Sequence, residues 1–284
     1  MHAFLSQAVA AAYTAAEAIL CHYDGPVVVE HKEDRSPLTA ADRAAHDVIV
    51  AALSQADPSI PILSEESRAI PTAERSAWTR FWLVDPLDGT KEFLKRNGEF
   101  TVNIALIEGG RPVLGVVLSP VLKTVYVGGL GLGAFKGCAG RDYTSRTDLV
   151  SGAADPAGAG WEALPCRGGP AVNSVRVVAS RSHDSAETRA FVERLEADHG
   201  QVSLVAIGSS LKLCLLAEGS ADVYPRLAPT MEWDTAAAHA VVEAAGGQVL
   251  EYPGGTPLRY NKANLLNPCF VASSAGWRAR SGGG

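Results

Sequence analysis

Two carboxylates separated by a Pro-Leu pair stand out in the run FWLVDPLDGT, in which an apolar stretch ends in Asp85 and Asp88. The apolar stretch is typical of a buried strand, which would hold the first acid, and the turn after it would aim the second. The proline cannot extend a strand ladder, and Gly89 allows close backbone approach. The N–H groups of Gly89 and Thr90 could therefore form an anion-binding concavity beside the acids, which implies a cation between them.

The ligand chemistry of this motif favours a hard cation. It offers oxygen ligands without a neighbouring His or Cys, and such a set suits Mg²⁺ shared between carboxylates and a substrate phosphate. The alternative is an Asx-type turn with two solvated acids. A turn would need neither the buried strand nor the Gly-Thr pair, so we predict a Mg²⁺ site.

Three further acids are candidates for the same site. Glu65 follows the apolar run before it and would reach the strand-end edge that carries Asp85, although an exposed helix start would look similar. Asp234 opens an expected helix, where the alternative is an N-cap. Asp42 follows Thr39 at capping-box spacing, so a structural role and a catalytic role both stay open.

Composition limits the classes of function. The chain has 284 residues, 47% of them hydrophobic, and a net charge of −6, which argues against general binding to nucleic acid. The five cysteines form no CxxC pair and predict reduced thiols. Without a basic leader or a long apolar run, we expect a cytoplasmic protein with no transmembrane segment. Peripheral association with the cytoplasmic face of the inner membrane stays open.

Hydrophobic periodicity predicts which elements carry these residues. Helical spacing covers residues 5–20 and continues in a second helix from Thr39, and five strand-like runs follow as an antiparallel sheet. After residue 172, strand-like and helical runs alternate in the manner of an α/β unit. We therefore expect an N-terminal α+β half over residues 1–145, a connecting loop over 146–172, and a C-terminal α/β half over 173–284.

The two acidic motifs resemble the signatures of a known family. Asp85-Pro-Leu-Asp-Gly-Thr90 and Trp233-Asp-Thr-Ala-Ala237 are similar to the two signatures of the inositol monophosphatase-like, Mg²⁺-dependent and Li⁺-sensitive phosphatases. Within that family, four shorter segments resemble the CysQ-type 3'(2'),5'-bisphosphate nucleotidases. They are Ser36 to Asp42, Lys91-Glu-Phe93, Ser180 to His183 and Tyr260-Asn-Lys262.

The resemblance implies a layered αβαβα sandwich and hydrolysis of one phosphate from adenosine 3',5'-bisphosphate, or from phosphoadenosine phosphosulfate, as part of sulfur metabolism. It implies a monomer or homodimer that binds two or three Mg²⁺ ions. The ligands carried over are Glu65, Asp85, the Leu87 carbonyl, Asp88 and Asp234.

The resemblance also implies catalytic roles. Glu65, Asp85 and Leu87 would hold the ion that activates water, which the Thr90 hydroxyl and Asp42 would orient. Asp85, Asp88 and Asp234 would hold the ion at the leaving group. Gly89 and Thr90 would hold the phosphate.

The rest of the nucleotide needs donors for a second phosphate, which Lys and Arg side chains supply. Lys212 within an apolar helical stretch could instead extend its amine to solvent, and His183 could be a residue of a helix start. The candidates for the nucleotide pocket are Lys91, Ser180, Arg181, His183, Ser209, Lys212 and Arg226.

Three alternatives remain at this stage. Hydrolysis of inositol monophosphate or fructose 1,6-bisphosphate would use the same metal site with another leaving-group pocket. A haloacid dehalogenase-type mechanism requires acids two positions apart, whereas Asp85 and Asp88 are three apart. A catalytically silent metal or nucleotide sensor would keep the fold for binding alone.

Overall fold

The computed structural model describes residues 1–25, 29–31, 37–138, 151–167, 174–179 and 185–277. Two long helices begin the chain, as the periodicity predicts, and shorter helices follow between strands. The helices are α1 (His2–Tyr23), α2 (Ala40–Ala56), α3 (Thr72–Arg75), α4 (Thr90–Lys95), α6 (Ala186–His199), α7 (Leu211–Glu218) and α8 (Glu232–Ala244), and residues 151–154 are also helical.

In the part of the chain that the structure describes, the strands form three sheets, one of which is only the small pair of β1 and β2. Among the described residues, β3 to β9 make a seven-stranded sheet and the later strands make a five-stranded one. The strands are β1 (Val29–His31), β2 (Pro37–Thr39), β3 (Ile62–Ser64), β4 (Arg80–Asp88), β5 (Thr101–Glu108), β6 (Arg111–Ser119), β7 (Thr124–Gly129), β8 (Gly133–Cys138), β9 (Glu162–Ala163), β10 (Ser174–Ala179), β11 (Gln201–Ala206), β12 (Val223–Arg226), β13 (Gln248–Glu251) and β14 (Phe270–Ser273).

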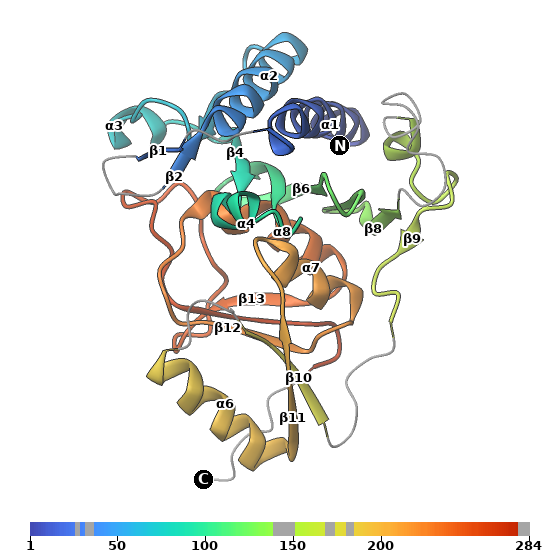
Figure 1. Cartoon of the computed structure of the whole chain (residues 1–284), viewed down its shortest axis with the longest axis vertical. Helices are drawn as coiled ribbons and strands as arrows, with labels where there is room; N and C mark the ends of the chain where they lie inside the picture. Colours follow the sequence, from blue (N-terminus) through green and yellow to red (C-terminus); the bar gives the residue numbers. More distant parts are fainter. Residues whose placement is uncertain (26–28, 32–36, 139–150, 168–173, 180–184, 278–284) are drawn as a thin grey trace.

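Helices and sheets alternate in five layers across the described part of the chain (Figure 1). The helices α1 and α2 cover one face of the seven-stranded sheet, and α8 lies against its other face together with α7. The five-stranded sheet follows, and α6 forms the outermost layer. This arrangement is the αβαβα sandwich that the resemblance implies, so the expected fold is confirmed.

Both faces of the seven-stranded sheet are buried, because successive residues of its strands contribute apolar side chains to opposite faces. On β4, Trp82 and Val84 pack toward α1 and α2, whereas Phe81 and Leu83 pack toward α7 and α8. Successive side chains of a strand point to opposite faces, so one apolar run supplies two cores. The sheet therefore holds the acids at the end of β4 on a backbone that is packed from both sides.

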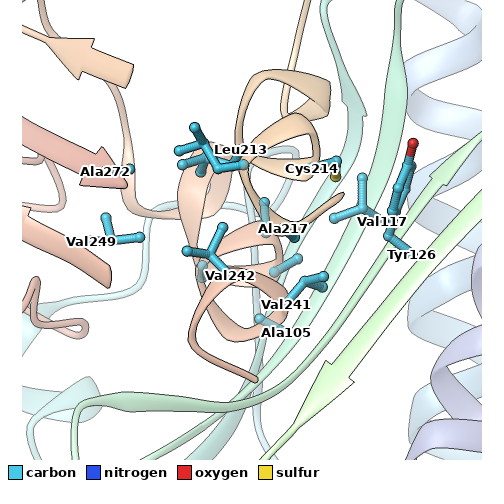
Figure 2. Packing of buried hydrophobic residues seen from close by; sticks show 14 of the residues in the cluster. Ala105, Val117, Tyr126, Leu213, Cys214, Ala217, Val241, Val242, Val249 and Ala272 are labelled. Atoms are coloured by element: carbon cyan, nitrogen blue, oxygen red, sulfur yellow. The ribbon is translucent and has the colours of Figure 1, made fainter. Parts of the chain in front are cut away.

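The helix α8 approaches this sheet closely because two strands carry glycine at the contact. A Cβ atom on Gly115 of β6 would lie 2.0 Å from the Ala237 oxygen, and one on Gly128 of β7 would lie 2.6 Å from the Val241 Cα atom. Figure 2 shows Val241 and Val242 of this helix among buried side chains of both sheets. The close packing sets the position of α8, which carries Asp234.

The structure departs from the sequence-based expectations in several elements. β3 pairs parallel with β4, so the first sheet is not purely antiparallel. The strand β8, which follows β7 after a short turn, is not among the strand-like runs that the periodicity predicts. Part of the expected loop forms β9, and β14 was also missed, because short pairings depend on neighbouring strands more than on local pattern. Residues 139–150 and 168–173 lie outside the described residues.

Among the described residues, α1 is long and apolar enough to cross a membrane by length and composition alone. In the structure, its residues Leu5, Val9, Ala12 and Ile19 are buried and belong to the core cluster under the seven-stranded sheet. The apolar character of α1 is therefore accounted for by packing inside the protein.

Replacing Gly115 by Ala should destabilise the fold, because the new methyl group would overlap the backbone of α8. We expect a loss of about 1–3 kcal/mol in the free energy of unfolding, measured by denaturant titration. Gly254→Ala is the matched control, since nothing lies within 4 Å of a Cβ atom at that position. Equal stability of the two variants would contradict the close contact between α8 and the sheet.

Candidate active site

The predicted acids meet where strands of the first sheet end. Glu65 follows the last residue of β3, and its N–H donates to the Val84 oxygen of the neighbouring strand at 3.1 Å. Asp85 lies on β4, and Asp234 lies in the first turn of α8. One ligand oxygen from each of Glu65, Asp85 and Asp234 lies within 4.8 Å of the other two. Three converging carboxylate oxygens fit a hard cation such as Mg²⁺.

Asp85 and Asp88 are separated by an irregularity in the ladder between β4 and β5, where the register shifts. Such bulges redirect side chains at strand ends. Asp85 is buried, and its Oδ1 accepts a hydrogen bond from the Leu87 N–H at 3.1 Å. Asp88 is partly exposed and faces the cavity described below. The predicted buried strand is present, so the reading as an isolated turn of solvated acids is wrong.

Neither Glu65 nor Asp234 has the purely structural role that was the alternative to metal binding. Glu65 lies in a turn after β3 and does not start a helix. Asp234 is the third residue of α8, and Met231 holds the N-cap position, so the N-cap alternative is wrong. Asp234 Oδ2 nevertheless accepts a hydrogen bond from the Met231 N–H at 2.8 Å. The carboxylate therefore stabilises the helix start and also belongs to the acidic cluster that would bind a cation.

Asp42 has the structural role that its sequence context left open, and its catalytic role stays a prediction. It forms a capping box with Thr39, whose N–H donates to Asp42 Oδ2 at 2.8 Å. Its other oxygen, Oδ1, accepts a hydrogen bond from the Thr90 hydroxyl at 3.3 Å. Asp42 is buried, so this pair joins α2 to the start of α4 at the edge of the acidic cluster.

Gly89 sits at the N-cap of α4 with φ +96°, a backbone conformation that other residues adopt only with strain. A Cβ atom there would also lie 3.3 Å from Ser209 Cβ. The glycine therefore permits both the turn after Asp88 and the approach of the segment before α7. This explains why the motif requires glycine before threonine.

Burial and like charge raise the proton affinity of the clustered acids. Desolvation raises the pKa of Asp85 well above its usual range, and the nearby Glu65 and Asp88 raise it further. Desolvation, followed by the charge of Asp88, raises the pKa of Asp234 to about 8. A divalent cation would reverse this preference by neutralising the repulsion.

A cavity of about 320 Å³ opens beside Asp88 and Asp234. Four of the predicted pocket residues line it, namely Lys91, Ser209, Lys212 and Arg226. Lys212 Nζ donates to the Ser209 oxygen at 3.0 Å, and an Arg226 nitrogen donates to the Pro229 oxygen at 2.9 Å. The predicted residues Ser180, Arg181 and His183 lie outside the described residues.

Several lining residues were missed by the sequence analysis. Lys95 adds a further cation, and Glu99 Oε2 accepts a hydrogen bond from the Gly208 N–H at 2.9 Å across the two halves of the chain. Tyr224 and Phe270 contribute apolar surface from β12 and β14. Only Lys95 and Glu99 had a sequence signal, which is their position just after the DGTKEF segment; the aromatic pair comes together only in the fold.

The sequence matches a known family along nearly its full length. The model of the inositol monophosphatase family matches residues 1–279. The 3'(2'),5'-bisphosphate nucleotidase CysQ of Salmonella typhimurium is 46% identical over 269 residues, covering 94% of this chain and 98% of that protein. The CysQ nucleotidase of Escherichia coli K12 is 45% identical over 273 residues, covering 95% and 99% of the two chains.

Solved structures give the same picture. The crystal structure of CysQ from Bacteroides thetaiotaomicron, a bacterial member of the inositol monophosphatase family, superposes with a TM-score of 0.82 at 44% identity. It covers 96% of this chain and 98% of that one. The inositol monophosphatase of Thermotoga maritima has a TM-score of 0.69 at 22% identity, covering 93% and 89%. That second likeness concerns the fold alone.

The metal-free protein should lose thermal stability as pH rises. A carboxyl whose pKa is higher in the folded state favours the fold below its unfolded pKa, and this contribution disappears as pH passes the folded pKa. For Asp234 that loss is complete only above its folded pKa of about 8. We expect the melting temperature in EDTA to fall between about pH 5 and about pH 9, and Mg²⁺ to reduce the fall.

Two variants separate this effect from other titrations. Asp234→Asn should lessen the fall in EDTA because the titrating group is removed, whereas Asp57→Asn, at the C-cap of α2 and so at the opposite end of that helix from Asp42, should leave it unchanged. A melting temperature in EDTA that stays constant or rises over this range would contradict the raised pKa values.

Proposed function

The chain belongs to the inositol monophosphatase family, and we propose on that premise that it is a Mg²⁺-dependent 3'(2'),5'-bisphosphate nucleotidase converting adenosine 3',5'-bisphosphate to AMP and phosphate. The observation that carries the proposal is the presence of four basic side chains in the cavity. Lys91, Lys95, Lys212 and Arg226 line it, together with the acids Asp88, Glu92, Glu99 and Asp234. Four cations suit a substrate with a second phosphate, which inositol monophosphate lacks.

The acidic cluster would hold two or three Mg²⁺ ions. In the proposed assignment, Glu65, Asp85 and the Leu87 carbonyl hold one ion, and Asp85, Asp88 and Asp234 hold another. The convergence of oxygens from Glu65, Asp85 and Asp234 supports a shared site, and the raised pKa of Asp85 indicates how strongly it needs positive charge. When bound, the ions supply charge neutralisation and a water of lowered pKa.

The pair of Thr90 and Asp42 is proposed to orient the attacking water. Asp42 Oδ1 accepts from the Thr90 hydroxyl, so the threonine oxygen is held with its lone pairs available to accept a hydrogen bond from water. Because Asp42 Oδ2 is engaged by Thr39, the carboxylate cannot rotate away. The backbone of Gly89 and Thr90 is proposed to hold the reacting phosphate.

The rest of the nucleotide is proposed to occupy the cavity. Its volume of about 320 Å³ is in the range of small-ligand pockets. Lys212 and Arg226 would bind the second phosphate, with Ser209, Lys91 and the predicted segment 180–183 as further contacts. Tyr224 and Phe270 offer apolar surface for the base.

The proposal includes a cytoplasmic monomer or homodimer. Cys21, Cys166, Cys214 and Cys269 are unpaired thiols, as expected for a reducing compartment. Attachment to the inner membrane is not part of the proposal, since the apolar face of α1 packs into the core.

Substrate preference tests the proposed function. Phosphate release should be fast with adenosine 3',5'-bisphosphate and Mg²⁺, slow with inositol 1-phosphate or fructose 1,6-bisphosphate, abolished by EDTA and reduced by Li⁺. Asp88→Asn is the control for hydrolysis at this site, and it should keep the fold but lose most turnover. Preference for inositol 1-phosphate would replace the substrate assignment, and the absence of metal-dependent release from all three would favour a silent sensor.

Arg226→Ala should raise the KM for adenosine 3',5'-bisphosphate by roughly 10-fold to 100-fold, because a charge-assisted hydrogen bond is worth about 1.5–3 kcal/mol. The KM for a monophosphate such as 3'-AMP should change little, since it lacks the second phosphate. Arg259→Ala is the matched control, because Arg259 also donates to a backbone oxygen but lies outside the cavity. Equal effects on both substrates would contradict a second-phosphate site at Arg226.

A further inference from the structure

Ser210 is a buried residue that contacts three separate elements around the acidic cluster. It occupies the N-cap of α7, where a serine side chain normally accepts a hydrogen bond from its own helix. Here the hydroxyl makes no such bond. It lies instead 2.8 Å from Asp88 Oδ2 and 2.7 Å from the Asp234 backbone oxygen.

A second neutral side chain completes this arrangement. Asn103 on β5 donates from Nδ2 to Ser210 Oγ at 2.9 Å, and the same nitrogen lies 3.4 Å from Asp88 Oδ2. Asn103 is the ladder partner of Asp85, so the two side chains leave the same face of the sheet. Because the amide fills a lone pair of Ser210 Oγ, the serine proton is directed toward Asp88 or the Asp234 carbonyl.

The hydrogen bonds distinguish the two oxygens of Asp88. Oδ2 accepts the Ser210 N–H at 2.6 Å as well as the Ser210 hydroxyl. The hydrogen bonds recorded for Asp88 within the described residues all reach Oδ2, which leaves Oδ1 as the oxygen to face a cation. Fixing one oxygen in this way sets the rotation of the carboxylate.

Burying the side-chain amide of Asn103 costs free energy. Its Oδ1 atom is buried without a hydrogen-bond partner among the described residues. A leucine of similar size would avoid that cost, so packing alone does not account for the amide. The contacts that the amide does make are those of Nδ2 with Ser210 and Asp88.

We propose that Ser210 and Asn103 are positioning residues that orient Asp88 and join it to the first turn of α8 for cation binding. The inference rests on the proposed function for the identity of the cation. Both side chains are neutral, so they add no charge to the cluster and act through geometry. The pair links β4 and β5 of the seven-stranded sheet to the helices α7 and α8 at the site.

Calorimetric titration of the metal-stripped protein with Mg²⁺, without substrate, tests the proposal. Ser210→Ala should weaken Mg²⁺ binding about tenfold, which is the lower end of the effect expected when a group that orients a metal ligand is lost. The effect is at the lower end because the Ser210 backbone N–H still holds Asp88. Ser210→Thr keeps a hydroxyl and should restore most of the affinity. Asn103→Leu should weaken binding in the same direction.

Ser274→Ala is the matched control, since Ser274 is also a buried serine but follows β14 at the end opposite Phe270, which lines the cavity. Its Mg²⁺ affinity should equal that of the wild type, and melting temperatures in EDTA identify any variant that fails to fold. In turnover assays of Ser210→Ala, the fold increase in the Mg²⁺ concentration for half-maximal rate should exceed the fold decrease in kcat.

Wild-type Mg²⁺ affinity in folded Ser210→Ala and Asn103→Leu would overturn the positioning role. That result is separate from a failure of the proposed function, because the titration contains no nucleotide. If the wild type hydrolyses the nucleotide and both variants bind Mg²⁺ with normal affinity, the positioning role is wrong and the proposed function stands.

Discussion

Mutual repulsion among clustered carboxylates is the constraint on which the site depends. Glu65, Asp85 and Asp234 bring ligand oxygens within 4.8 Å of one another, and Asp88 adds its charge beside them. Folding must hold these groups together before a cation arrives, and the raised pKa values of Asp85 and Asp234 show the cost. The two cores that pack β4 from both faces supply the stability for this arrangement.

Three of the acids use one carboxylate oxygen for a hydrogen bond that stabilises local structure and direct the other oxygen toward the site. Asp42 uses one oxygen for Thr39 and the other for the Thr90 hydroxyl, while Asp88 directs one oxygen to Ser210. Asp234 likewise gives one oxygen to the Met231 N–H. In each case a hydrogen bond that stabilises local structure also fixes the direction of the remaining oxygen. Structural and functional roles therefore reinforce each other, since an oriented ligand needs less reorganisation to bind.

The layered fold connects the site to both sheets. The helix α8 lies close to the seven-stranded sheet because β6 and β7 have glycine at the contact, and its first turn brings Asp234 to the end of β4. The segment before α7 then brings Ser209 and Ser210 against Gly89 and Asp88. The cavity forms between these parts, so its lining comes from both halves of the chain.

The sequence alone determined the acids, the strand that ends in Asp85, the long helices and the layered family fold, because each depends on local pattern or on a long signature. It also indicated Lys212 and Arg226 as cations of the pocket. It did not determine the partners of those groups: the parallel pairing of β3, the strands β8 and β14, and the contacts of Asn103 with Ser210 join residues far apart in the chain. Only tertiary structure decides such contacts, because hydrogen-bond geometry and burial arise when distant elements pack together.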